Sequence, residues 1–180
     1  MKGTNLSVFT ISLGRKRAEK VISVPLKKLV QPYDVTLIFM FSFIHFPIPE
    51  GVNTIILRPE EVRTRSSILK IFDSIFFVRE YHRVIKKKKI SYAISFLALP
   101  NLINEIISKI KPTVKSYIIE RGYTTYNTAS KLSIYISRIF FPLLYNKYDK
   151  LFSNPKYINE NLNKTQLRNQ KFYEGYIYSD

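Results

Sequence analysis

Residues 35–46, VTLIFMFSFIHF, form the most hydrophobic run in the chain and decide its fold. A helix that spans a bilayer needs roughly 20 apolar residues, so this run is too short to cross a membrane. Apolar side chains on both faces of a short segment are typical of a buried central strand. We therefore expect a central strand here, with an interfacial membrane segment as the alternative.

The neighbouring segments carry the patterns of further strands and a helix. Residues 6–13 alternate apolar and polar side chains, which predicts a half-buried strand that Gly14 ends. Residues 15–30 space their apolar side chains by three and four positions between lysines and arginines, as in an amphipathic helix. After a turn at residues 47–51, residues 52–57 predict another strand.

Farther along, the apolar spacing becomes helical and then alternates again. It predicts a helix that begins near Glu60 or Arg65 and fades around Phe77. Residues 78–85 return to near-alternation and are interpreted as a strand, followed by a run of lysines. Residues 91–99 are apolar and fit either a strand or a helix.

The last third of the chain changes character. Residues 102–110 predict a short helix, and residues 114–119 predict a strand. Beyond Gly122 a helix is expected over residues 127–141, and the arm from Tyr145 onward has too few aliphatic side chains to build a core. The chain is therefore divided into a domain over residues 1–122 and a C-terminal helical extension and arm over residues 123–180.

The charge balance points to an anionic partner. Lys and Arg number 29 against 13 Asp and Glu, a formal net charge of +16. Such a surplus pushes a compact body apart unless a partner neutralises it, and nucleic acid is the first candidate. The absence of cysteine excludes disulfides, thiolate nucleophiles, iron–sulfur clusters and cysteine-based zinc sites.

Side chains that could carry catalysis are few and scattered. His45 is interpreted as a buried, hydrogen-bonded side chain, and His82 as an RNA-contacting or surface residue. Glu60, Glu61 and Asp73 could hold magnesium, but neighbouring arginines and a helix start account for them. The 5 glycines are scattered and form no phosphate-binding loop. We expect a protein that is not an enzyme and has neither cofactor nor metal.

The basic side chains gather in runs with almost no acidic compensation. Lysine and arginine bind phosphates without reading sequence, and single tyrosines can stack on unpaired bases, so structured RNA fits this combination. The predicted RNA-binding residues are Arg15, Lys16, Arg17, Lys20, Arg58, Arg63, Arg65, Arg79, His82, Arg83, Lys86, Lys87, Lys88 and Lys89.

Three short motifs follow one another along the chain: Pro47-Ile48-Pro49, Leu57-Arg58-Pro59, and a segment from Phe76 to Ile85 that fits F-x-x-R-x-x-x-R-[LV]-I. In this order they resemble small-subunit ribosomal protein ten. The resemblance covers about residues 5–119. It implies an α+β fold, a two-layer sandwich of a mixed sheet with helices on one face, plus a C-terminal helix and an extended basic, tyrosine-rich arm.

The resemblance also implies a function. It indicates a structural constituent of the ribosome that binds ribosomal RNA and neighbouring proteins in the head of the small subunit, with no small-molecule substrate and no stable membrane insertion. The tail rich in Asn, Lys, Ile and Tyr favours an organellar, mitochondrial ribosome, and the retained Met1 favours synthesis inside the organelle. One alternative is a basic accessory subunit of a mitochondrial membrane-bound respiratory complex, and another is an RNA-processing nuclease.

Overall fold

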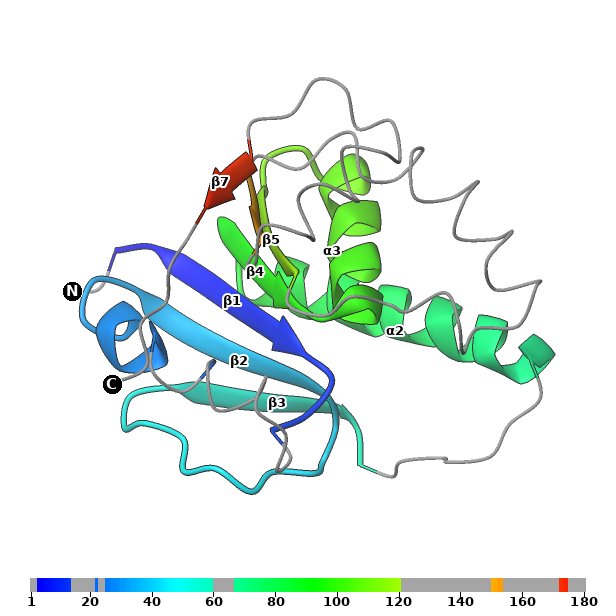
Figure 1. The fold of residues 1–180 in the computed structure, drawn as a ribbon, viewed down its shortest axis with the longest axis horizontal. Helices are drawn as coiled ribbons and strands as arrows, with labels where there is room; N and C mark the ends of the chain where they lie inside the picture. The colour runs from blue at the N-terminus through cyan, green and yellow to red at the C-terminus, as the bar shows by residue number, and fades with distance from the viewer. Residues whose placement is uncertain are drawn as a thin grey trace.

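A computed structural model describes residues 3–13, 22, 25–59, 67–120, 150–153 and 172–174 of the chain (Figure 1). Strands and helices alternate along most of this length, with a short helical segment at residues 25–29 between the first two strands. The elements are β1 (Asn5–Thr10), β2 (Asp34–Phe41), β3 (Asn53–Arg58), α2 (Ser67–Lys87), β4 (Tyr92–Phe96), α3 (Ala98–Ile110), β5 (Lys115–Glu120), β6 (Lys150–Ser153) and β7 (Phe172–Glu174).

All of these strands belong to one parallel sheet, in the order β3-β2-β1-β4-β5-β6-β7. The chain moves outward from β1 to β3, returns through α2 to β4 beside β1, and then moves outward in the other direction. This reversal of strand order is the mark of a doubly wound, Rossmann-like α/β fold. It places β1 and β4 side by side, with Leu6 opposite Tyr92 and Phe9 opposite Ser95.

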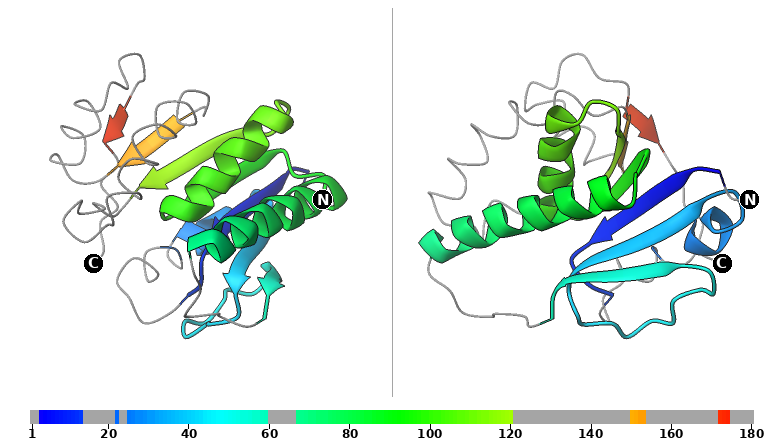
Figure 2. Two further views of the ribbon diagram at one scale, coloured as in Figure 1. Left: turned by 90° about the vertical axis from the view of Figure 1, so that its right-hand side faces the viewer. Right: turned by 180° about the vertical axis from the view of Figure 1, so that it is seen from behind.

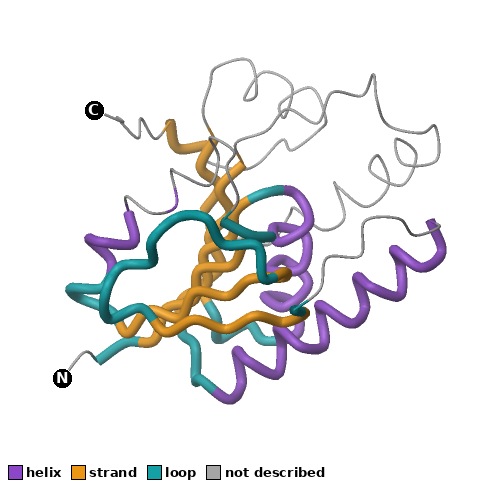
Figure 3. Tube along the Cα trace, turned by 90° about the horizontal axis from the view of Figure 1, so that it is seen from below, coloured by secondary structure: helices purple, strands orange, loops and turns teal. Residues whose placement is uncertain are grey.

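Helices cover both faces of the sheet, because the connections on either side of the reversal cross on opposite faces. On one face Phe9, Ile38 and Met40 pack against α2 and α3. On the other face the helical segment that contains Leu26 packs on strand residues such as Val8. Figure 2 shows α2 and α3 together on the first face, and Figure 3 shows the helical segment across the strands from them.

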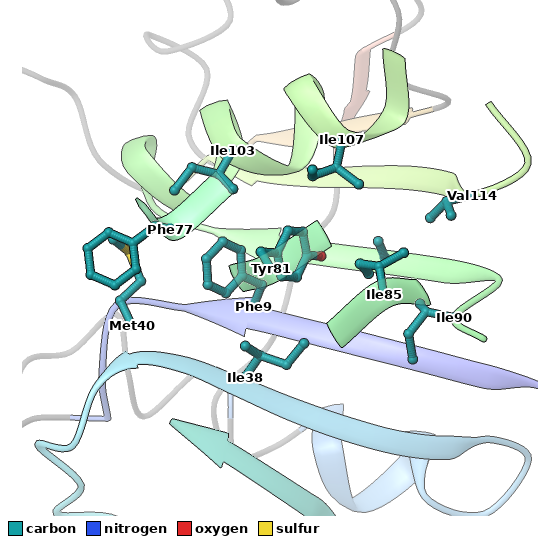
Figure 4. Close-up of a cluster of buried hydrophobic side chains, with 11 residues drawn as sticks. Phe9, Ile38, Met40, Phe77, Tyr81, Ile85, Ile90, Ile103, Ile107 and Val114 are labelled. Atoms are coloured by element: carbon teal, nitrogen blue, oxygen red, sulfur yellow. The ribbon is translucent and has the colours of Figure 1, made fainter. Parts of the chain in front are cut away.

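Tyr81 is the largest fully buried side chain at the centre of the first face. Its ring stacks on Phe9 with centroids 4.2 Å apart and planes 13° from parallel. Figure 4 shows this pair between Phe77 and Ile85 of α2, with Ile103 of α3 close by. Phe77, Tyr81 and Ile85 are four positions apart, so α2 presents one apolar stripe to the sheet.

The predicted fold class is wrong in two respects. The sheet is parallel rather than mixed, and helices cover both of its faces rather than one. The predicted strand at residues 78–85 is also wrong, because these residues form the second half of α2. Their near-alternation is incidental, and the four-residue spacing from Phe77 to Ile85 is the pattern that packing enforces.

Other elements are confirmed. The run at residues 35–46 supplies the buried strand β2, which lies inside the sheet next to the edge strand β3, with Val35 to Met40 all buried; residues 42–46 lie beyond its end. The predicted strands at residues 6–13, 52–57 and 114–119 correspond to β1, β3 and β5, and the predicted helix at residues 102–110 lies within α3. In the described part of the chain no helix has both the length and the apolar character needed to cross a membrane.

The C-terminal third is only partly described. The predicted helix over residues 127–141 lies outside the described residues. Within the predicted arm, β6 pairs with β5 and β7 pairs with β6, so these short segments extend the sheet. The division of the chain at residue 122 stays a prediction.

Candidate functional site at the carboxyl edge of the sheet

The carboxyl ends of β1 and β4 define the candidate site. In doubly wound sheets ligands bind outside the carboxyl ends of the strands at the point where the strand order reverses, because the connections there diverge to opposite faces. By the register of the two strands, Thr10 at the end of β1 stands beside Phe96 at the end of β4. Leu97 follows at once and begins the passage into α3.

Thr10 brings a buried hydroxyl to this edge. Its side chain is fully buried, and its Oγ1 has no hydrogen-bond partner in the described part of the chain. A buried polar atom without a partner costs about 1–3 kcal/mol, so natural proteins rarely keep one without a use.

Leu97 holds a backbone conformation that suits glycine. Its φ of 75° and ψ of 153° lie in a region that L side chains seldom enter. Leu97 is the residue before α3, and no side chain caps the first turn of that helix. Asn101 fixes this turn to the sheet by donating from Nδ2 to the carbonyl of Ile119 at 3.3 Å. The strained residue therefore sets where the start of α3 meets the carboxyl edge.

The segment after β2 adds exposed rings to the same edge. The Leu13 N–H donates to the carbonyl of Phe43 at 3.0 Å, and the His45 N–H donates to the carbonyl of Leu13 at 2.7 Å. Ile44 points inward and packs against the core, which leaves Phe43 and His45 outside. Their ring centroids are 4.4 Å apart at 83°, and Phe43 is 45% exposed. The sequence analysis predicted a buried side chain for His45, and this prediction is wrong because His45 is exposed.

A buried polar network supports the strands beneath the site. The Tyr81 hydroxyl shares a hydrogen bond with Ser7 Oγ at 3.2 Å and donates to Asn104 Oδ1 at 3.4 Å. Asn104 Nδ2 donates to the Ala93 carbonyl at 3.3 Å and to Ser95 Oγ at 3.1 Å. The network joins β1, α2, α3 and β4 and so fixes the spacing of the two strands that flank the reversal. Burial raises the pKa of the Tyr81 hydroxyl, and the hydrogen bond with Ser7 opposes that rise only in part.

The residues predicted to bind RNA do not form one surface. Arg58 lies at the carboxyl end of β3, where its guanidinium pairs with Asp73 at 2.7 Å. The lysines at residues 86–89 lie at the opposite, amino edge, after the other end of α2. Asp73 and Lys87 are separated by about 20 Å along that helix, at 1.5 Å per residue.

The remaining predicted residues divide between α2 and undescribed segments. Arg79, His82 and Arg83 are on α2, where Arg79 and Arg83 are exposed and Arg83 pairs with Glu80 at 2.6 Å. Outside the described residues lie Arg15, Lys16, Arg17, Lys20, Arg63 and Arg65, together with the acidic residues Glu60 and Glu61. Within the described ranges, no group of three or more metal-binding side chains gathers.

Comparison with known proteins finds solved structures that share this fold. No family model matches the chain, and no curated protein matches its sequence. The solved structures that it resembles include sucrose-phosphate synthase from Thermosynechococcus elongatus, with a TM-score of 0.67 at 8% identity over 94% of this chain and 47% of that one.

Two further solved structures share the fold of this chain. The lipopolysaccharide outer core galactosyltransferase WaaB superposes with a TM-score of 0.63 at 10% identity, over 95% of this chain and 45% of its own. UDP-GlcNAc 2-epimerase from Methanocaldococcus jannaschii superposes with a TM-score of 0.57 at 13% identity, over 94% of this chain and 45% of its own. The chain thus spans somewhat less than half the length of these proteins, and at such low identity the likeness concerns the fold.

These findings overturn the ribosomal interpretation. The segment from Phe76 to Ile85 matched a ribosomal motif, but here it lies in a helix of a parallel α/β fold. The respiratory-subunit alternative fails as well, because residues 35–41 are a buried strand rather than a surface for lipid. The neighbours are enzymes whose names specify sugars or a UDP-sugar, which contradicts the expectations of a non-enzymatic protein, of ribosomal RNA as partner and of no small-molecule substrate. The mitochondrial location stays a prediction.

Sequence reasoning missed the residues that define this edge. Thr10 and Leu97 are 87 positions apart by number, and no local pattern marks either of them. The signal that could have found them is topological, since Thr10 ends one strand and Leu97 directly follows another. It becomes readable only when β1 and β4 are known to be parallel neighbours.

Proposed function

We propose that this chain is the part of a nucleotide-sugar-dependent enzyme that binds a sugar substrate, and that the reaction is glycosyl transfer. The observation that carries the proposal is the reversal of strand order between β1 and β4, which brings Thr10 and Leu97 to one edge. The structures that share this fold are carbohydrate enzymes, and ligands of such sheets bind at this edge.

The groups at the edge suit a hydroxyl-rich ligand. The Thr10 hydroxyl can donate to or accept from a sugar or phosphate oxygen, and the exposed imidazole of His45 can do the same. The ring of Phe43 offers an apolar face for the carbon–hydrogen side of a sugar ring. The net charge of +16 favours the approach of an anionic substrate such as a nucleotide sugar.

Glycosyl transfer is preferred to epimerisation on the quality of the superposition. The synthase and the galactosyltransferase give TM-scores of 0.67 and 0.63, whereas two UDP-GlcNAc 2-epimerases give 0.57 and 0.60. The two reactions leave different products, since transfer releases the nucleotide and epimerisation keeps the sugar attached to it. A UDP-release assay and analysis of the remaining sugar nucleotide therefore distinguish them.

The direct test is ligand binding by saturation-transfer NMR on the full chain, which detects weak binding. The panel contains UDP, UDP-GlcNAc, UDP-galactose, free galactose and free N-acetylglucosamine. We expect magnetic saturation to pass from the protein to at least one sugar or sugar nucleotide of the panel. If none of the panel receives saturation, the proposal is wrong.

Thr10→Val makes the test specific to the site. The change replaces the hydroxyl with a methyl group of similar shape, so affinity for the ligand should fall about tenfold, the equivalent of one hydrogen bond. The unliganded protein should not be destabilised, because Oγ1 has no partner to lose. Thr54→Val, at an exposed position in β3, is the matched control and should bind normally. Equal affinity in both variants would place the site elsewhere.

A further inference from the structure

The lysines at the amino edge of the sheet have no part in the proposed site. Lys86 and Lys87 end α2, Lys88 and Lys89 form the turn after it, and all four are exposed. Hydrogen bonds join this turn to the start of the sheet, because Asn5 Nδ2 donates to the Lys88 carbonyl at 2.9 Å. The run therefore has a fixed position at one end of the molecule.

A second basic segment lies beside the first. The Lys115 N–H donates to the Ser91 carbonyl at 2.9 Å, and the Val114 N–H donates to the Lys111 carbonyl at 3.1 Å. The first bond holds the loop between α3 and β5 against the loop between α2 and β4, and the second closes the α3–β5 loop on itself. Together they form the amino-edge lysine patch, whose members are Lys86, Lys87, Lys88, Lys89, Lys111 and Lys115.

The patch has almost no acidic compensation. Neither segment 86–91 nor segment 109–115 contains Asp or Glu. Within the described residues no member of the patch forms an ion pair, and Asp34, at the amino end of β2, accepts a hydrogen bond from Asn53 at 3.0 Å. Lys115 Nζ lies 5.8 Å from the centre of the Tyr92 ring, so the four exposed lysines at residues 86–89 are the cations that an external anion would meet.

Helix dipoles account for only part of this arrangement. Cations stabilise the last turn of a helix, which explains Lys86 and Lys87, but the effect fades beyond that turn. Lys89 has a φ of 50°, a left-handed conformation in which glycine would be favoured over lysine. A lysine at that position costs conformational energy, which suggests that its charge has a use.

An apolar side chain marks the kind of partner. Ile110 is 57% exposed at the end of α3, between Lys109 and Lys111, and the following Pro112 and Thr113 are exposed too. A bilayer with anionic headgroups offers a charged layer for the lysines and an apolar layer beneath it for Ile110. The phosphate backbone of a nucleic acid has no such apolar layer beneath its charges, and neither does an acidic protein surface.

We propose that the amino-edge lysine patch docks the protein on an anionic lipid surface, with Ile110 entering the headgroup region. The carboxyl edge is at the other end of the strands, so this orientation leaves the candidate site open. Each lysine near an anionic membrane contributes about 1 kcal/mol at physiological ionic strength, and such binding weakens with added salt. Because the proposal concerns a different surface, it does not depend on the proposed sugar site.

The first test is co-sedimentation with vesicles. The full chain should bind vesicles made from equal parts of phosphatidylcholine and phosphatidylglycerol, and should not bind phosphatidylcholine alone. Lys87→Gln with Lys88→Gln should weaken binding at least tenfold, because roughly 1 kcal/mol is lost per lysine. The comparison variant, Lys27→Gln with Lys28→Gln, removes equal charge from exposed positions in the helical segment on the other face of the sheet, and it should weaken binding clearly less than the first pair.

The second test reports on insertion. The chain has no tryptophan, so Ile110→Trp gives a single fluorophore at the proposed contact. Its emission should shift to the blue with anionic vesicles, whereas Ile75→Trp, at an equally exposed position on α2, should not shift. Equal loss of binding in both lysine pairs, or equal shifts in both tryptophan variants, would overturn the proposal. So would an RNA oligonucleotide that binds through Lys87 and Lys88 when vesicles do not.

Discussion

Tyr81 shows how one hydroxyl can hold four elements in place. Its ring lies in the core against Phe9, yet its hydroxyl reaches Ser7 on β1 and Asn104 on α3. Tyr81→Phe keeps the ring and the stacking and removes only the oxygen. Asn104 Nδ2 retains its bonds to β4, but Asn104 Oδ1 and Ser7 Oγ each lose a buried partner, so the free energy of unfolding should fall by about 1–2 kcal/mol. Urea denaturation measures this change, and a variant as stable as the parent would show that the network contributes nothing.

The same substitution should change the dependence of stability on pH. Burial raises the pKa of Tyr81, so the folded chain keeps this proton at a pH where the unfolded chain, with an ordinary tyrosine pKa of about 10, loses it. The stability that depends on this proton is fully present below about pH 10. As the pH rises further, the free energy of unfolding falls by up to about 1.4 kcal/mol per pH unit. The free energy of unfolding, measured by urea denaturation at several pH values above 10, should therefore fall less steeply with pH for Tyr81→Phe than for the parent chain.

Lys89 is the position where a glycine should stabilise the protein. Its φ of 50° is left-handed, and the Ile90 N–H donates to the Ile85 carbonyl at 3.0 Å, the bond that closes a helix at such a residue. Lys89→Gly relieves about 1–2 kcal/mol of backbone cost and adds up to about 1 kcal/mol of unfolded-state entropy. The net gain should be about 0.5–1 kcal/mol by thermal denaturation. Lys88→Gly, whose backbone is not left-handed, should be destabilising instead.

Arg58 and Asp73 connect two elements at the scale above the residue. The pair joins the end of β3 to the first half of α2 at 2.7 Å, and the guanidinium also lies over the rings of Phe76 and Phe77, at 4.5 and 5.2 Å. Both side chains are about four-fifths buried, so solvent screens the pair less than a surface pair.

A double-mutant cycle should detect this connection. For Arg58→Ala and Asp73→Ala, the coupling free energy should be about 1 kcal/mol. Arg58→Lys should lose much of it, because lysine cannot both pair and stack its planar group on a ring. If the changes in the free energy of unfolding of the two single variants add up to that of the double variant, the ion pair contributes no coupling and only the ring contacts stabilise the protein.

The elements themselves were largely predictable from the sequence, and the exceptions have a physical cause. The periodicity of β1, β2 and α3 is set by one buried face or two, so it is visible locally. Residues 78–85 combine a helical stripe with incidental alternation, and nothing local decides between them. What decides is Tyr81, whose partners Ser7 and Asn104 are far away in sequence.

The arrangement of the whole molecule was not predictable in this way. Whether β4 pairs with β1 or with β3 depends on contacts across some 80 residues, and the candidate site exists only because it pairs with β1. The basic runs were visible in the sequence, but their meaning depends on where the fold places them. Arg58 pairs with Asp73, whereas Lys86 to Lys89 are exposed at the amino edge.

Net charge leads to a prediction for the molecule as a whole. A charge of +16 repels itself, and the repulsion is larger in the compact state than in the unfolded chain. Raising the ionic strength from about 0.01 to about 0.1 M shortens the screening length from about 30 to about 10 Å, so distant like charges cease to interact. The melting temperature should therefore rise with sodium chloride over this range. Lys87→Gln with Lys88→Gln should raise the melting temperature at low salt and make it depend less on salt, because these two lysines lie within a run of four consecutive lysines. A melting temperature that is constant with salt, or that falls, would show that attractive pairs such as Arg58–Asp73 outweigh the repulsion.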